Sequence, residues 1–150
     1  MGRILGIDNG DKRIGIALSD PTRTIATAHT TIEEESIKKR IATILQIAHE
    51  NQADQIVIGL PLNMDGTTGP SALKAKDLAT RISRQPGAPP VALYDERMST
   101  LIATRTLHET RTKRKHHKKT IDKLAAQVIL QNYLDNLPPT PNNPETPYDI

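Results

Sequence analysis

Residues 3–19, RILGIDNGDKRIGIALS, contain two apolar runs separated by the polar segment DNGDK. Asn9-Gly10 between two such runs is a strong signal for a hairpin, because both residue types tolerate the left-handed backbone of a tight turn. In the second run, Ile and Leu alternate with smaller or polar residues, which is the pattern of a half-buried strand. The sequence therefore predicts two antiparallel strands, over residues 3–7 and 13–18.

The rest of the chain alternates between helix and strand patterns. Thr-rich residues 24–32 predict a third antiparallel strand at an edge of the sheet. After that, apolar residues recur at helical spacing or in short runs that end at turn residues. In chain order these patterns predict a helix capped by Ser36, a strand at 55–60, a helix starting at Pro70 with Leu73 on its apolar side, a strand at 91–94, a helix capped by Ser99 or Thr100, and a last helix capped by Thr120.

This order of elements predicts an α/β fold. Three antiparallel strands followed by two αβ units give a mixed five-stranded sheet flanked by helices, with the fourth and fifth strands parallel to the first. We expect residues 1–137 to form this single domain. Residues 138–150 contain five prolines and no periodicity, so we expect a disordered tail there.

Composition excludes several functions. The chain has no Cys, which rules out disulfides, thiolate zinc sites and cysteine nucleophiles. No apolar run approaches the roughly 20 residues that span a bilayer, and the N-terminus does not resemble a signal peptide. We therefore expect a cytoplasmic protein without membrane contact. With no Phe or Trp and only three Tyr, stacking on unpaired bases is not expected, so any nucleic-acid recognition would depend on backbone charge and shape.

Positive charge is concentrated in one segment, residues 111–119. The whole chain has 20 basic and 17 acidic residues, and six of the basic ones lie in this segment. We predict a basic loop that binds nucleic-acid phosphates, with a solvated, mobile loop as the alternative. Its candidate binding residues are Lys113, Arg114, Lys115, Lys118 and Lys119.

Acidic and amide side chains follow the predicted parallel strands. Asp8 comes after the first strand, Asn63 and Asp65 after the fourth, and Asp95 and Glu96 after the fifth. Because the carboxyl ends of parallel strands share one edge of a sheet, we expect a site for a hard metal ion there. Adjacent strand residues point to opposite faces, so only one of Asp95 and Glu96 should join Asp8. Each acid could also be an ordinary turn or surface residue.

Asp122 is a further candidate. We expect it in the first turn of the last helix, where a carboxylate interacts favourably with the helix dipole. Its neighbours at i+3 and i+4 are Ala125 and Ala126, so Asp122 borders the buried face of the helix. A carboxylate in that position is costly unless it is paired or bound to metal.

Four segments in this order resemble the YqgF family, also called RuvX, of Holliday junction resolvases in the RNase H-like superfamily. They are ILGIDNGDKRIGIA (4–17), VIGLPLNMDGTTGP (57–70), YDERMST (94–100) and KKTIDKLAAQVILQNYLD (118–135). The resemblance covers residues 3–136. A lone D-x-G motif would be weak, because sugar kinases and actin-like ATPases share it, whereas the four segments together are specific.

The resemblance implies an RNase H-like fold and a hydrolase that cleaves phosphodiester bonds. It implies that Asp8, Glu96 and Asp122 are the catalytic acids and hold Mg²⁺ or Mn²⁺. A pair of ions about 3.5–4 Å apart would activate the attacking water and stabilise the leaving oxygen. No histidine is required as a ligand.

The implied substrate is structured nucleic acid, either a four-way DNA junction or the 5′ end of pre-16S rRNA during ribosome biogenesis. We favour rRNA processing, because a small domain without a dimer signature, expected to be a monomer or weak homodimer, is poorly suited to paired symmetric cuts.

Two other classes of function remain as alternatives. An ATP-dependent phosphotransferase of the actin or sugar-kinase type would use the D-x-G hairpin to hold ATP, but such enzymes need two domains around a cleft. A nucleic-acid module that binds without cleaving would not need the three acids, so the presence of all three argues against it.

Overall fold

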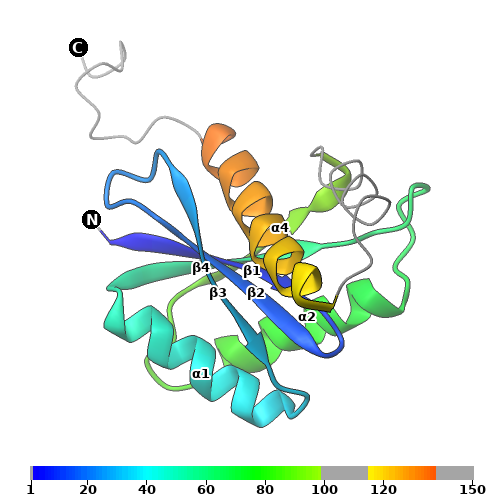
Figure 1. Ribbon diagram of the computed structural model, residues 1–150, viewed down its shortest axis with the longest axis horizontal. Coiled ribbons are helices and arrows are strands. Elements are labelled where there is room, and N and C mark those ends of the chain that lie inside the picture. The colour runs from blue at the N-terminus through cyan, green and yellow to red at the C-terminus, as the bar shows by residue number, and fades with distance from the viewer. Residues whose placement is uncertain (1, 99–114, 138–150) are drawn as a thin grey trace.

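A five-stranded sheet with helices on both faces makes up the fold, as the computed structural model shows (Figure 1). The structure describes residues 2–98 and 115–137. The elements are β1 (Arg3–Asn9), β2 (Arg13–Ser19), β3 (Ala26–Glu33), α1 (Ile37–Glu50), β4 (Ala53–Leu60), α2 (Pro70–Ser83), β5 (Val91–Asp95), a 3₁₀ turn η1 (Glu96–Met98) and α4 (Lys115–Asp135).

The strand order is β3-β2-β1-β4-β5. The first three strands pair antiparallel, whereas β1–β4 and β4–β5 pair parallel. The predicted mixed sheet is therefore confirmed. β1 lies at its centre, so the residues that follow β1 and β4 emerge beside each other at one edge.

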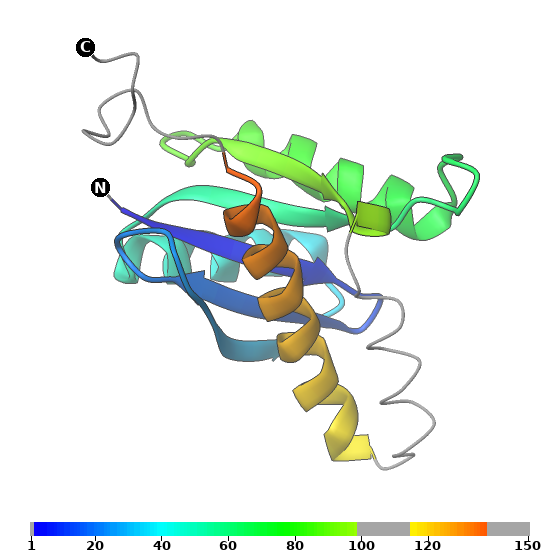
Figure 2. The ribbon, with the colours of Figure 1, turned by 90° about the horizontal axis from the view of Figure 1, so that it is seen from above.

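Two apolar clusters cover the two faces of the sheet. Of the helices that the structure describes, α1 and α2 pack on one face and α4 crosses the other (Figure 2). Alternation along β1 divides its residues between the two: Leu5 and Ile7 belong to the α1/α2 cluster, whereas Ile4 belongs to the α4 cluster. Among the described helices, none is both long and apolar enough to cross a membrane.

The last helix begins earlier than the sequence predicted. We expected a loop up to a Thr120 cap, but α4 starts at Lys115, so the basic stretch from Lys115 to Lys119 forms its first turns. The apolar periodicity that marked this helix starts only at Ile121, and the preceding lysines and histidines give no such signal. Asp122 consequently lies about two turns inside the helix, and not in its first turn as predicted.

Helix α2 also differs from the prediction in one residue. Leu73 was expected on its apolar side but is 59% exposed. The buried side of the helix is made instead by Ala72, Ala75, Leu78, Ala79 and Ile82. The predicted helix after residue 100, Lys113, Arg114 and the predicted tail lie outside the described residues.

Candidate active site

Asp8 is a buried acid near the carboxyl end of the central strand. The residue is only 6% exposed. Its neighbour Ile7 packs against α1 and α2, so strand alternation puts Asp8 on the face that α4 crosses. In the β1–β2 ladder, Asp8 is the direct partner of Gly15.

Helix α4 passes directly over that glycine. A Cβ atom built on Gly15 would lie 2.0 Å from the carbonyl oxygen of Asp122, so only glycine permits this approach. Gly15 lies in β2 and pairs with Asp8 of β1. The backbone of Asp122 therefore crosses β2 directly beside Asp8. The side chain of Asp122 is half-buried.

Glu96 approaches Asp8 from the other side. It is the first residue of η1, directly after β5, and is only 3% exposed. A Cβ atom on Gly59 would lie 2.7 Å from the Glu96 Oε2 atom and 2.6 Å from Ile129 of α4. Gly59 directly follows Ile58, the ladder partner of Ile7, so the parallel register puts Gly59 beside Asp8.

These contacts gather the three predicted acids on one face and at one edge of the sheet. Asp8 lies on the central strand, with Gly15 beneath α4 on one side and Gly59 beneath Glu96 on the other. Among the side chains that the structure describes, however, no three acidic or histidine side chains are close enough to form a ready-made metal cluster. The structure thus shows convergence of the acids without a closed ligand set.

Asp95 is engaged elsewhere. Its carboxylate accepts hydrogen bonds from the side chain and backbone of Arg97, the shortest side-chain contact being 2.8 Å. The Arg97 guanidinium holds the pKa of the Asp95 carboxyl below its usual range. Glu96 and not Asp95 therefore lies over the sheet beside Asp8, in line with the expectation that only one of the two would do so.

In the loop after β4, the polar side chains of Asn63 and Asp65 bind to Thr67 of the same loop. Asp65 accepts hydrogen bonds from the backbone and hydroxyl of Thr67, and these bonds lower the pKa of its carboxyl. Asn63 donates to the same hydroxyl at 2.8 Å. These contacts stabilise the loop, and they do not bring either residue to the three acids.

Sequence reasoning missed the two glycines that bring the elements together. Glycine inside a strand weakens it and often marks a close approach by another segment. Gly15 and Gly59 both carry this signal, but the sequence alone does not say which segment approaches them. Their partners, Asp122 and Glu96, are more than 35 residues away in the chain.

Comparison with known proteins identifies the family of this chain. Residues 2–136 match a protein family described as "RuvX: Holliday junction resolvase". The chain belongs to the RuvX family. The predicted resemblance is therefore confirmed, and it covers nearly the whole described chain.

Curated RuvX relatives are similar along most of their length. A Syntrophomonas wolfei protein is 45% identical over 133 residues, which is 89% of this chain and 94% of the relative. A Thermoanaerobacter pseudethanolicus protein is 46% identical over 138 residues, 89% of this chain and 96% of the relative. Both carry the name "Putative pre-16S rRNA nuclease".

A solved resolvase shares the fold. The Thermus thermophilus RuvC protein in complex with a Holliday junction superposes with a TM-score of 0.51 at 13% identity, covering 89% of this chain and 94% of that one. Membership of the RuvX family supports a nuclease role. It favours neither the phosphotransferase nor the binding-only alternative.

Proposed function

We propose that this RuvX protein is a divalent-metal-dependent nuclease that hydrolyses phosphodiester bonds in structured nucleic acid. The observation that carries the proposal is the pair of buried carboxylates, Asp8 and Glu96, beside the crossing point of α4 at Asp122. Buried carboxylates are costly unless they are paired, hydrogen-bonded or bound to metal. Their meeting at the carboxyl ends of parallel strands is the usual position of a site in an open α/β sheet.

The donor set fits Mg²⁺ or Mn²⁺. Both ions accept carboxylate oxygens, and Mg²⁺ keeps several waters, so three protein carboxylates and a substrate phosphate suffice. Gly15 and Gly59 add to the fit, because the missing Cβ atoms let the backbone of Asp122 and the side chain of Glu96 approach the sheet beside Asp8. Asp8, Glu96 and Asp122 would hold the metal, and a pair of ions would supply an activated water and stabilise the leaving oxygen.

The protein's own contribution is to hold these carboxylates in place. Asp8 is fixed by the ladder of the central strand, and Glu96 is held over Gly59 at the start of a short 3₁₀ turn. Asp122 is fixed by the close contact of its backbone with Gly15. Each acid thus comes from a different element, and the packing of α4 on the sheet sets their spacing.

The start of α4 at Lys115 supports a role for the basic segment in substrate binding. In an α-helix, positions 115, 118, 119 and 122 recur at i, i+3, i+4 and i+7 and therefore share one side. Lys115 precedes Asp122 by seven residues, about 10 Å along the helix axis. A phosphate backbone bound along this side would run toward the proposed active site.

As the substrate we propose the 5′ end of pre-16S rRNA in preference to a four-way DNA junction. The names of the relatives at 41–46% identity support this choice. The decisive experiment offers both substrates to the protein with Mg²⁺ or Mn²⁺. Cleavage of the rRNA precursor is expected, and cleavage of the junction alone would reverse the choice.

The same assay tests the acids. Asp8→Asn, Glu96→Gln and Asp122→Asn should each abolish cleavage while the fold survives, because an amide lacks the charge that holds a cation. Asp95→Asn is the matched control, since Asp95 is paired with Arg97, and it should retain activity. Undiminished cleavage in excess EDTA would contradict the metal mechanism. Full activity of any one of the three variants would remove that residue from the proposed site.

Replacement of Lys113, Arg114 and Lys115 by Ala tests the basic segment. We expect weaker nucleic-acid binding at every sequence, with the slope of log K against log salt reduced by up to about 0.7–0.9 per lost phosphate contact. Alanine at Lys38, Lys39 and Arg84 removes the same charge from exposed positions on α1 and at the end of α2. If both triple variants have the same slope, net charge and not this segment governs binding.

A further inference from the structure

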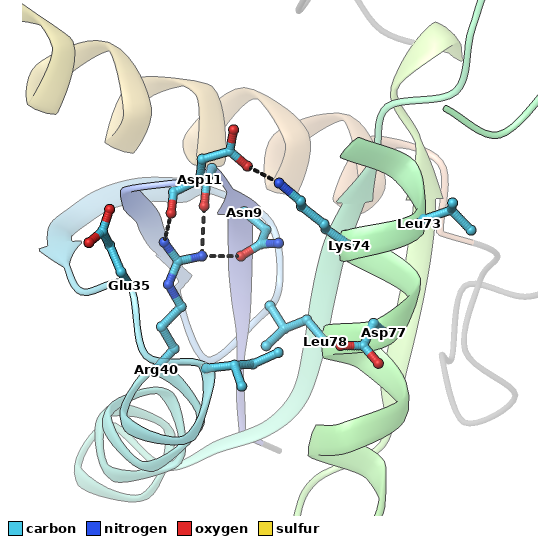
Figure 3. A pocket seen from close by; sticks show the side chains of 10 residues that line it. Asn9, Asp11, Glu35, Arg40, Leu73, Lys74, Asp77 and Leu78 are labelled. Carbon is cyan, nitrogen blue, oxygen red and sulfur yellow. Dashed lines mark hydrogen bonds and ion pairs between the residues drawn. The ribbon is translucent and has the colours of Figure 1, made fainter. Parts of the chain in front are cut away.

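A buried arginine lies beneath the turn that follows Asp8. Arg40, in the second turn of α1, is only 6% exposed. It borders a pocket of about 450 Å³ between α1, α2 and the β1–β2 turn (Figure 3). Nothing in the sequence analysis singled it out.

The Arg40 guanidinium is occupied by oxygens of the turn. Nη1 donates to the Gly10 carbonyl at 2.6 Å and to the Asn9 side-chain oxygen at 3.0 Å, and Nη2 donates to the Asp11 carbonyl at 2.6 Å. Nε donates to the carbonyl of Glu34, before the helix. Figure 3 shows the Arg40 guanidinium pointing toward Asn9 and the turn that carries Asp11. One side chain thus fixes three consecutive residues of the turn.

These contacts argue against a ligand in the pocket. The acceptors around Arg40 are neutral carbonyl and amide oxygens, and the second cation of the pocket, Lys74, is paired with Asp11 at 2.6 Å. Burial lowers the pKa of the Arg40 guanidinium, and the nearby acids Asp11, Glu34 and Glu35 oppose this shift. Both cations are therefore already engaged with the protein itself.

Strand alternation connects this arrangement to the proposed site. Asp8 and Asn9 are adjacent in β1, so Asp8 lies on the α4 face and Asn9 on the α1/α2 face. By holding the Asn9 side chain and the next two carbonyls from one face, Arg40 fixes the backbone that orients Asp8 on the other. We propose that Arg40 is a positioning residue of the nuclease, acting on metal binding by Asp8 through the β1–β2 turn. This inference rests on the proposed function.

The chain contains a matched control at the opposite end of the same strand. The Arg23 side chain donates to the Gly2 carbonyl at 3.0 Å and pairs with Asp54. It therefore also holds a backbone carbonyl, that of the residue directly before β1, but far from Asp8. Arg23→Met should lower stability without changing the proposed metal site.

The experiment compares Arg40→Met, Arg23→Met and wild type. Mn²⁺ affinity is measured by isothermal titration calorimetry, amide exchange is followed in residues 9–13, and cleavage is measured as a function of Mn²⁺. Arg40→Met should speed exchange in the turn and weaken Mn²⁺ binding roughly 10–100-fold, the range found when residues that orient metal ligands are replaced. Saturating Mn²⁺ should recover part of its cleavage rate. Arg23→Met should match the wild-type affinity.

Asn9→Ala and Arg40→Lys provide milder variants if Arg40→Met does not fold. Each keeps part of the contacts, so each should weaken Mn²⁺ binding by less than the Met variant. Equal Mn²⁺ affinity in the Arg40 variants, Arg23→Met and wild type would overturn the positioning role alone. Wild-type protein that neither binds Mn²⁺ nor cleaves nucleic acid would overturn the proposed function, and this inference with it.

Discussion

The two faces of the sheet differ in the size and polarity of the residues they present. The face covered by α1 and α2 is made of large aliphatic side chains, among them Leu5, Ile7 and Ile16. The face covered by α4 has glycine at positions 6, 15 and 59 and alanine at position 17, and it carries the buried acids Asp8 and Glu96. The same strands supply residues to both faces, because successive residues of a strand point to opposite sides of the sheet.

This difference assigns stability mainly to one face and the assembly of the acids to the other. Large apolar side chains fill the space between the sheet and helices α1 and α2, and their burial stabilises the fold. Small residues let α4 approach the backbone of the sheet, so that a carboxylate from the helix can reach carboxylates from the strands. We therefore expect substitutions within the apolar α1/α2 cluster to change stability alone, and those on the α4 face to change activity as well.

The largest effect is expected from Gly15→Ala. The new methyl group would overlap the Asp122 carbonyl, and because that atom belongs to the backbone, α4 itself must move. Overpacking of this kind costs about 1–3 kcal/mol. We expect cleavage to be lost at temperatures where the variant is still folded, as judged by denaturant unfolding and a metal-dependent assay. Normal turnover would show that the spacing between α4 and the sheet does not set the activity.

Ile16→Val, one residue further along the same strand, should affect stability alone. Ile16 is fully buried in the α1/α2 cluster, and loss of one methyl group there costs about 0.5–1.5 kcal/mol. Cleavage per folded molecule should equal that of wild type. If turnover falls as strongly as in Gly15→Ala, the two faces are not functionally distinct.

A smaller effect is expected from Arg97→Gln, which removes the partner of Asp95. The pKa of Asp95 should rise toward its ordinary value of 3.8, and a carboxyl NMR titration would measure this. Since the folded-state pKa is lowered, the pair stabilises wild type above about pH 4, and this contribution is lost as pH falls through the folded-state pKa. In the Arg97→Gln variant, the stability of the fold should not show this loss as the pH falls. An unchanged Asp95 titration would mean that Arg97 is not its main partner in solution.

The smallest effect is expected from removal of residues 138–150. The sequence of this segment has too little apolar surface to pack on either face. The melting temperature and cleavage rate of the shortened chain should equal those of the full chain. A large drop in melting temperature would show that the segment contributes to one of the two faces.

Features that depend on local chemistry could be predicted from the sequence. The hairpin at residues 3–19 was predicted, but its turn was not at Asn9-Gly10: Asn9 still pairs with Ile14, neither residue has a positive φ, and the chain reverses between Gly10 and Arg13. The parallel pairing of β4 and β5 follows from the αβ units before them. The start of α4 could not be predicted, because residues 115–120 have no apolar periodicity. The exposure of Leu73 depends on how α2 is rotated on the sheet, which helical spacing alone does not fix.

Contacts between distant segments could not be predicted from the sequence. The acids could be assigned to one edge of the sheet. The role of Gly15 and Gly59 could not be predicted, because it depends on the close approach of Asp122 and Glu96. Likewise, Arg40 in α1 looks like a surface residue at its position between two lysines and an isoleucine. Its contacts with the β1–β2 turn span about 30 residues and follow only from the packing of α1 under that turn.

The position of α4 in the chain has a consequence for synthesis. It comes after the five strands, and among the described residues it is the helix that packs on one face of the sheet. During translation the residues that α4 covers, such as Ile4 and Val57, therefore lack this cover until the last helix has left the ribosome. The same helix carries Asp122, so the nascent chain acquires its last proposed acid in the step that closes its core. Folding would thus delay nuclease activity until the domain is complete.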